Sequence, residues 1–214
     1  MSNTGRWSLL ALVAVVALIV ALWPRGDDTA DPNSDTDPSA MTAAPMGAAP
    51  NAADRAAAQL VPCPVAEAAP APQAALAGVN LDCLADGRPV DLGAALAGRP
   101  ALLNLWAYWC APCAEELPYL EDYAARARGE VTVLTVHSDP DEAKALARLT
   151  DLGVHLPGVA DGHTRVRAVA GAPNALPVSV LLRADGSIAE VVARPFRSVD
   201  DIAGVVERSL GVAA

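Results

Sequence analysis

Two cysteines stand where a buried strand ends and a helix begins, and this junction constrains the fold more than any other part of the chain. The apolar run Ala101 to Trp106 is short and rich in large side chains, which is typical of a strand covered on both faces. Cys110 and Cys113 follow within the sequence WCAPC. Apolar residues then recur at helical spacing, with Leu117 and Leu120 on one face.

This position predicts reversible exchange between a dithiol and a disulfide. The N-terminus of a helix offers unpaired N–H groups and a positive dipole end, and a thiol there has its pKa lowered from about 8.5 to roughly 3.5–7.5. Cys110 is the predicted nucleophile, because the first cysteine should be the more exposed and the nearer to the dipole. Cys113, one turn into the helix, is the predicted resolving thiol.

A zinc half-site is the alternative for two cysteines at this spacing, but it needs two further ligands. The chain has three histidines, and they form no ligand spacing. His137, which ends a predicted strand, is interpreted as a loop histidine rather than one that borders the site. We therefore expect no metal and no cofactor.

The sequence LLNLWAYWCAPCAEELP at residues 102–118 resembles the active site of the thioredoxin superfamily, and in detail its TlpA/ResA branch of extracytoplasmic thiol–disulfide reductases. Asn104 stands where cytoplasmic thioredoxins have a buried Asp. Glu116 and Pro118 form the E-x-P sequence of the branch. The sequence LPVSVLL at residues 176–182 is similar to the strand that carries a cis-proline facing the active-site disulfide.

The resemblance implies further site residues. It gives Glu116 control of the acid–base behaviour of the thiols, and a proton must leave Cys113 when that residue attacks a mixed disulfide. A solvated first-turn Glu that merely favours the helix dipole is the alternative. Pro177 is implied to be cis, so that the backbone of Leu176 pairs with an extended substrate segment. Trp109, beside the nucleophile, is predicted to be exposed and to contribute to this docking surface.

The N-terminal residues are predicted to anchor the chain in a membrane. Trp7 to Trp23 is 17 residues without a charge, at the short end of the roughly 17–25 that a transmembrane helix needs, with Trp at both interfaces. We assign residues 1–24 to this anchor, and a cleaved signal peptide is the alternative. Residues 25–62 contain no aromatic or branched aliphatic residue before Leu60 and are predicted to form a disordered linker.

Residues 63–214 are predicted to form one α/β domain of the thioredoxin type, with a central mixed sheet and helices on both faces. A hairpin around Ala184-Asp185-Gly186 makes the sheet mixed rather than purely parallel. The predicted strands are 79–84, 101–106, 131–136, 178–183 and 187–192, and the main predicted helices are 111–128, 139–150 and 198–210.

Cys63 and Cys83 are predicted to form a structural disulfide. Four cysteines allow three pairings, and this one leaves the redox pair intact. A second redox pair is the alternative, although neither cysteine stands at a helix start or beside a Trp. Four cysteines behind an apolar N-terminal segment suit an oxidising compartment, and a net charge of −10 argues against nucleic acid as a partner.

The predicted function is that of an enzyme, a thiol–disulfide oxidoreductase on the extracytoplasmic side of the cell membrane. The resemblance implies a reductive direction, oxidised protein substrates such as apocytochrome c in cytochrome c maturation, and a transmembrane electron donor of the CcdA or DsbD type. Two alternatives use the same thiolates. One is a protein disulfide oxidase or isomerase, and the other is a copper(I) chaperone.

Overall fold

The computed structural model describes residues 49–66 and 70–213, and the strands of this part form one seven-stranded sheet in the order β2-β1-β5-β4-β3-β6-β7. The strands are β1 Asn80–Cys83, β2 Pro89–Asp91, β3 Ala101–Trp106, β4 Thr132–His137, β5 Gly158–Ala160, β6 Val178–Leu182 and β7 Ile188–Val192. Strands β3, β4 and β5 are parallel, whereas β1, β2, β6 and β7 run antiparallel to their neighbours. The predicted mixed sheet is confirmed.

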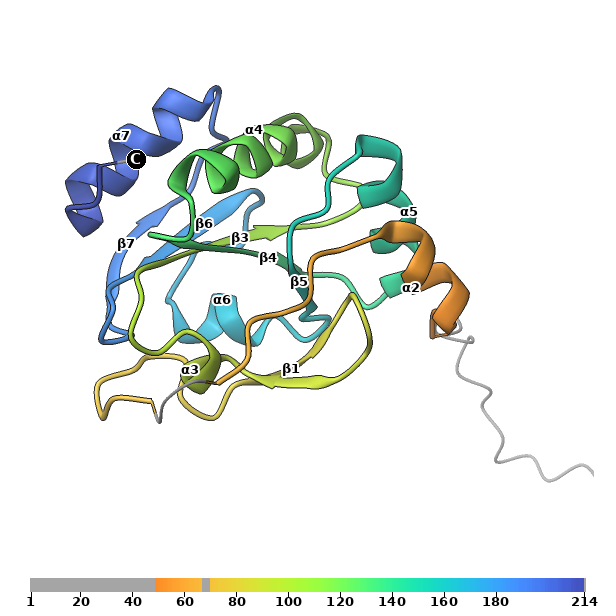
Figure 1. Cartoon of the computed structure of the whole chain (residues 1–214), viewed down its shortest axis with the longest axis horizontal. Helices are drawn as coiled ribbons and strands as arrows, with labels where there is room; N and C mark the ends of the chain where they lie inside the picture. Colours follow the sequence, from red (N-terminus) through yellow and green to blue (C-terminus); the bar gives the residue numbers. More distant parts are fainter. Residues whose placement is uncertain (1–48, 67–69, 214) are drawn as a thin grey trace, which may run out of the picture. The chain divides into compact units, whose positions relative to one another are not determined.

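Helices cover both faces of this sheet (Figure 1). One face carries α2 Ala52–Ala58, α4 Ala111–Ala127, α5 Glu142–Leu152 and α7 Val199–Leu210, and the other carries α3 Leu92–Ala95 and α6 Arg165–Val169. Leu117 of α4 and Val206 of α7 belong to the first apolar cluster, and Leu92 of α3 and Val166 of α6 belong to the second. The predicted thioredoxin-like layering is therefore present in the described residues.

Strand β3 lies inside the sheet, and all six of its residues are buried. It pairs with β4 so that Trp106 faces His137, and with β6 so that Leu105 faces Val178. The end of β3 is thus flanked by the ends of two neighbouring strands. The loop that leads from β3 to Cys110 therefore begins at a fixed position in the core.

The predicted linker of residues 25–62 overlaps a folded segment, and its end was placed too late. Helix α2 packs on α5, and both Ala58 and Leu60 are buried in the first apolar cluster. The side chain of Arg55 pairs with Glu142 of α5 at 2.9 Å. The prediction was wrong because the alanine side chains of α2 pack closely on α5, and this helix contains no large apolar residue that would indicate burial in the sequence.

The predicted anchor at residues 1–24, and the linker up to residue 48, lie outside the described residues. Within the described ranges, none of the helices has the length and apolar character needed to cross a bilayer.

Candidate active site

A disulfide joins Cys110 and Cys113 at the start of α4, with Cα atoms 5.3 Å apart. Cys110 is the N-cap residue of the helix, and its Sγ accepts a hydrogen bond from the backbone N–H of Cys113 at 3.3 Å. In the reduced protein the same N–H and the helix dipole stabilise a thiolate on Cys110. Cys110 is 5% exposed and Cys113 is fully buried, so an incoming disulfide reaches Cys110 first.

Trp109 stands out from the surface beside Cys110, with 60% of the residue exposed. Its indole Nε1–H donates to Asp139 Oδ2 at 3.0 Å, while Asp139 Oδ1 accepts the N–H of Asp141 in its own loop. The indole is therefore held in one orientation although most of its surface is in solvent. An exposed, oriented aromatic ring is suited to contact a partner protein.

His137 borders this loop, and its interpretation as an ordinary loop histidine is wrong. It is the last residue of β4, it is fully buried, and its ring lies 4.9 Å from that of Trp106. Its Nε2 accepts the backbone N–H of Tyr108 at 3.4 Å. Burial lowers the pKa of His137 to about 4, although Asp139 opposes this shift, so the ring is neutral at pH 7 and serves as an acceptor.

Glu116 is a fully buried carboxylate one turn beyond Cys113, on the same face of α4. Its Oε1 accepts from Asn104 Nδ2 at 2.6 Å, and its Oε2 accepts the backbone N–H of Phe196 at 2.7 Å. Burial raises the pKa of Glu116 to about 7, even though both hydrogen bonds act in the opposite direction. A carboxyl with this pKa takes up and releases protons near neutral pH.

Asn104 links Glu116 to the central strands. Its Nδ2 also lies 3.2 Å from Ser179 Oγ in β6, whereas its Oδ1 is buried without a partner among the described residues. The amide holds the carboxylate without being able to take its proton. Glu116 is therefore the one group of this polar cluster that titrates.

The peptide bond between Leu176 and Pro177 is cis, and Pro177 directly precedes β6. The register of β6 on β3 brings Pro177 beside the end of β3, from which the chain continues to Cys110. Leu176 is half-buried and packs against both apolar clusters. The docking role of these two residues stays a prediction that rests on the resemblance.

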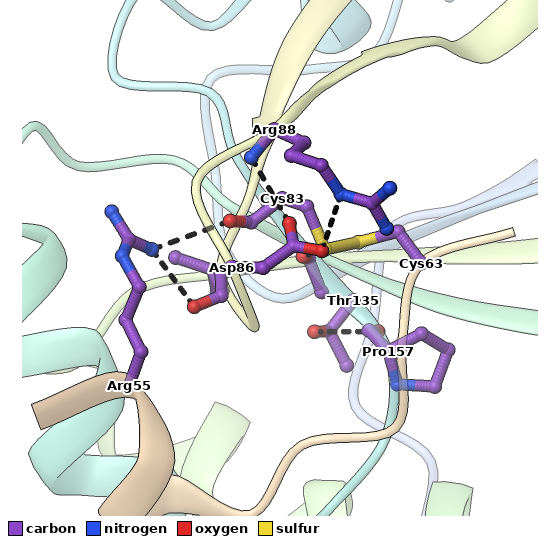
Figure 2. The surroundings of a disulfide bond; sticks show 9 residues. Arg55, Cys63, Cys83, Asp86, Arg88, Thr135 and Pro157 are labelled. Atoms are coloured by element: carbon purple, nitrogen blue, oxygen red, sulfur yellow. Dashed lines mark hydrogen bonds and ion pairs between the residues drawn. A yellow bond between two sulfur atoms is a disulfide. The ribbon is translucent and has the colours of Figure 1, made fainter. Parts of the chain in front are cut away.

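The second disulfide joins Cys63 and Cys83 with Cα atoms 6.0 Å apart, and Figure 2 shows its surroundings. Both cysteines are buried in the apolar cluster on the opposite face of the sheet from the Cys110–Cys113 pair. Arg55 donates to the carbonyl oxygens of Cys83 and Leu84 at 3.3 and 2.8 Å, which ties α2 to the same strand end. The sheet lies between the two disulfides, so the geometry favours a structural bond over a relay.

The family model described as Redoxin matches residues 64–206 of the chain. The chain belongs to the redoxin family. The predicted membership in the thioredoxin superfamily, with similarity to its TlpA/ResA branch, is also confirmed, because curated relatives of this redoxin carry the ResA name.

One such relative is the thiol-disulfide oxidoreductase ResA of Bacillus thuringiensis (strain Al Hakam), which is 26% identical over 108 residues. This match covers 50% of the chain and 61% of the relative, so the redoxin spans less than two thirds of that relative's length.

Two solved structures share the fold. A secreted Mycobacterium tuberculosis disulfide oxidoreductase homologous to E. coli DsbE has a TM-score of 0.53 and 29% identity, and the match covers 60% of this chain and 94% of that one. DsbF from M. tuberculosis, in its mixed oxidized and reduced forms, has a TM-score of 0.56 and 27% identity, with 66% and 98% covered.

The structure adds two groups to this redoxin's site that the sequence analysis did not name, the N–H of Phe196 and the carboxylate of Asp139. It also places the ring of His137 at the site, which the sequence analysis had considered and set aside. An acid placed just after a buried strand was the available signal for Asp139. A backbone N–H leaves no trace in the sequence, so Phe196 had none.

Proposed function

We propose that the chain is a thiol–disulfide oxidoreductase that reduces disulfide bonds of partner proteins through Cys110 and Cys113. The observation that carries this proposal is the hydrogen bond from the Cys113 N–H to Cys110 Sγ at the start of α4, with the buried Glu116 one turn away. The first feature favours a nucleophilic thiolate, and the second supplies a proton acceptor for the other thiol.

The reaction begins with the reduced protein. The Cys110 thiolate attacks one sulfur of a substrate disulfide, forming a mixed disulfide and releasing one substrate thiolate, which takes up a proton. The thiol of Cys113 then gives its proton to Glu116, and its thiolate attacks Cys110 Sγ. The Cys110–Cys113 bond forms, the mixed disulfide breaks, and the second substrate thiolate leaves and takes up the proton that Glu116 received from Cys113.

The balance of this cycle defines what else the protein needs. The substrate disulfide gains two electrons and two protons and becomes two thiols, while the Cys110–Cys113 dithiol becomes a disulfide. A further dithiol donor must therefore restore the reduced pair after each turnover. The resemblance to the TlpA/ResA branch supports a transmembrane donor of the CcdA or DsbD type and substrates such as apocytochrome c.

We place the catalytic domain on the outer side of the membrane, held by the predicted anchor at residues 1–24. All four cysteines are in disulfides, one of which lies on the opposite face of the sheet from the redox pair, and structural disulfides persist in oxidising compartments. The Mycobacterium tuberculosis relative named above is a secreted protein. Both observations support this location.

The test is reduction of insulin by the pre-reduced full chain, followed as loss of insulin disulfides. Cys113→Ser should stop turnover and accumulate a mixed disulfide between Cys110 and the substrate, whereas Cys110→Ser should form none. Turnover that survives Cys110→Ser would contradict the proposed mechanism.

The direction of electron flow is tested by the equilibrium reduction potential of the Cys110–Cys113 pair. A potential near that of thioredoxin, about −270 mV, supports a reductant, and one near about −120 mV supports an oxidase instead. Copper(I) titration of the reduced protein addresses the chaperone alternative. Tight stoichiometric binding that Cys110→Ser abolishes would favour a carrier over a reductase.

A further inference from the structure

The carboxylate of Glu116 is bound by a backbone group whose position depends on a loop. Phe196, which donates its N–H to Glu116 Oε2, lies in the segment that connects β7 to α7. Phe196 also lines an open hollow of about 580 Å³ together with Glu115, Tyr119, Pro195 and Arg197. A backbone N–H keeps its direction only if the segment that carries it is fixed, so the contacts of this loop decide how Glu116 is held.

Arg194 fixes the loop by pairing with Asp201 in the first turn of α7. Both terminal nitrogens of the Arg194 guanidinium donate to the Asp201 carboxylate, each at 2.8 Å, which is the bidentate geometry of strong pairs. The same carboxylate accepts the backbone N–H of Arg197 at 3.2 Å, and Arg194 donates to the Pro195 carbonyl at 3.1 Å. Phe196 thus lies between two residues that are bound to one carboxylate.

We propose that Arg194 is a positioning residue for Glu116, and that its pairing with Asp201 keeps the Phe196 N–H directed at the Glu116 carboxylate. This role rests on the proposed function, since it affects catalysis only if Glu116 takes the proton of Cys113. The Arg194 side chain is nearly half-exposed, so solvent screening limits what the pair adds to global stability even though its geometry is bidentate. The effect of losing it is therefore expected at Glu116 rather than in the stability of the fold.

The charged groups around Glu116 give the change a definite sign. Burial is the main cause of its raised pKa; among the charges, Arg194 lowers the pKa of Glu116 and Asp201 raises it. On α4 itself, Glu115 is exposed, and Cys113 does not titrate while it is in the disulfide. Loss of Arg194 removes a positive charge and loosens the N–H contact, and both changes raise the pKa of Glu116.

The test compares Arg194→Gln with Arg126→Gln in the oxidised full chain. Arg126 of α4 pairs at 2.7 Å with Asp200, which precedes Asp201 in the same helical turn, and its side chain is 43% exposed against 47% for Arg194. Both variants lose a guanidinium and one ion pair to α7. Only Arg194, however, belongs to the loop between β7 and α7 that carries Phe196. Two readouts are taken: the ¹³C titration of the Glu116 carboxyl and the hydrogen exchange of the Phe196 amide.

In Arg194→Gln, the Glu116 midpoint should rise by at least about half a pH unit. Exchange of the Phe196 amide should accelerate at least about tenfold. Arg126→Gln should change neither. A raised midpoint without faster exchange would mean that Arg194 acts only through its charge, and an unchanged midpoint would mean that it does not act on Glu116; either result overturns the positioning role.

Neither readout depends on catalysis, so this role and the proposed function fail separately. A wild-type chain that leaves insulin unreduced while both Arg194→Gln effects appear contradicts the proposed function and still supports the positioning of Glu116 by Arg194.

Discussion

Replacing Glu116 with glutamine should stabilise the oxidised protein relative to the wild type by an amount that grows as the pH rises. Glutamine keeps the shape of the side chain, and it can also form hydrogen bonds to Asn104 and to the Phe196 N–H. In the Glu116→Gln variant, the new side-chain oxygen can accept the Phe196 N–H. The new amide group takes the place of the oxygen that accepts from Asn104 Nδ2, so the Asn104 amide must turn over to present its Oδ1, which lacks a partner among the described residues of the native chain. The substitution therefore removes the ionisation and little else.

The magnitude follows from the shifted pKa of Glu116. The pKa rises from 4.5 to about 7 on folding because burial disfavours the charged form. Between these values the folded state binds more protons than the unfolded state, so stability falls as pH rises through this window. At 1.36 kcal/mol per pH unit, the native chain loses about 3 kcal/mol that Glu116→Gln retains.

His137 makes the comparison between the two proteins necessary. Burial lowers its pKa from 6.5 to about 4, so the folded state binds fewer protons in this window and stability is lost as pH falls. The contributions of His137 and Glu116 have opposite signs over nearly the same range. The pH profile of the native chain alone therefore hides both, and the difference between variant and native chain isolates Glu116.

The assay is urea unfolding without reductant at several pH values from 4 to 8, followed by tryptophan fluorescence. Glu115→Gln makes the same chemical change on the neighbouring residue of α4, which is exposed, and serves as the matched control. Its difference from the native chain should stay flat. A flat difference for Glu116→Gln as well would show that burial does not raise the pKa of Glu116. It would then remove the support for Glu116 as the proton acceptor of Cys113.

Three further outcomes are expected. His137→Leu should gain stability relative to the native chain as pH falls from 6.5 to 4, measured by the same unfolding assay; a constant difference would show that His137 is not held neutral by burial. Replacing both Cys63 and Cys83 with alanine removes a bond across 20 residues of sequence. This should lower the unfolding free energy by about 3 kcal/mol while insulin reduction persists at low temperature, and abolished activity in the folded variant would point to a redox role. Trp109→Phe keeps an aromatic surface but loses the bond to Asp139, so KM for insulin should rise about 2–10-fold with kcat unchanged, and a fall in kcat alone would assign Trp109 to the chemistry instead.

The features that could be predicted from sequence are those written in local patterns. The apolar run before Cys110 and the helical spacing after Cys113 located the strand-to-helix junction, and both β3 and α4 formed there. The pairing of Cys63 with Cys83 followed by elimination once the redox pair was assigned, and the structure contains that bond.

The remaining features depend on contacts between distant segments. Phe196 reaches Glu116 from 80 residues away, and it does so through a backbone group that any residue type except proline would provide. His137 is buried between β3 and β5 and contacts the rings of Trp106 and Tyr108, which the sequence of β4 does not show. The short helix ending at Ala58 was missed because its alanines gain their apolar contacts from α5 rather than from their own size.

The two disulfides lie on opposite faces of one sheet, which separates the Cys110–Cys113 bond from the Cys63–Cys83 bond. An electron donor that docks at Cys110 contacts one face of the sheet, whereas Cys63 and Cys83 belong to the apolar cluster on the other face. Repeated rounds of reduction can thus open one crosslink without loosening the other. The Cys63–Cys83 crosslink can therefore persist while the Cys110–Cys113 bond is broken and formed again in each cycle.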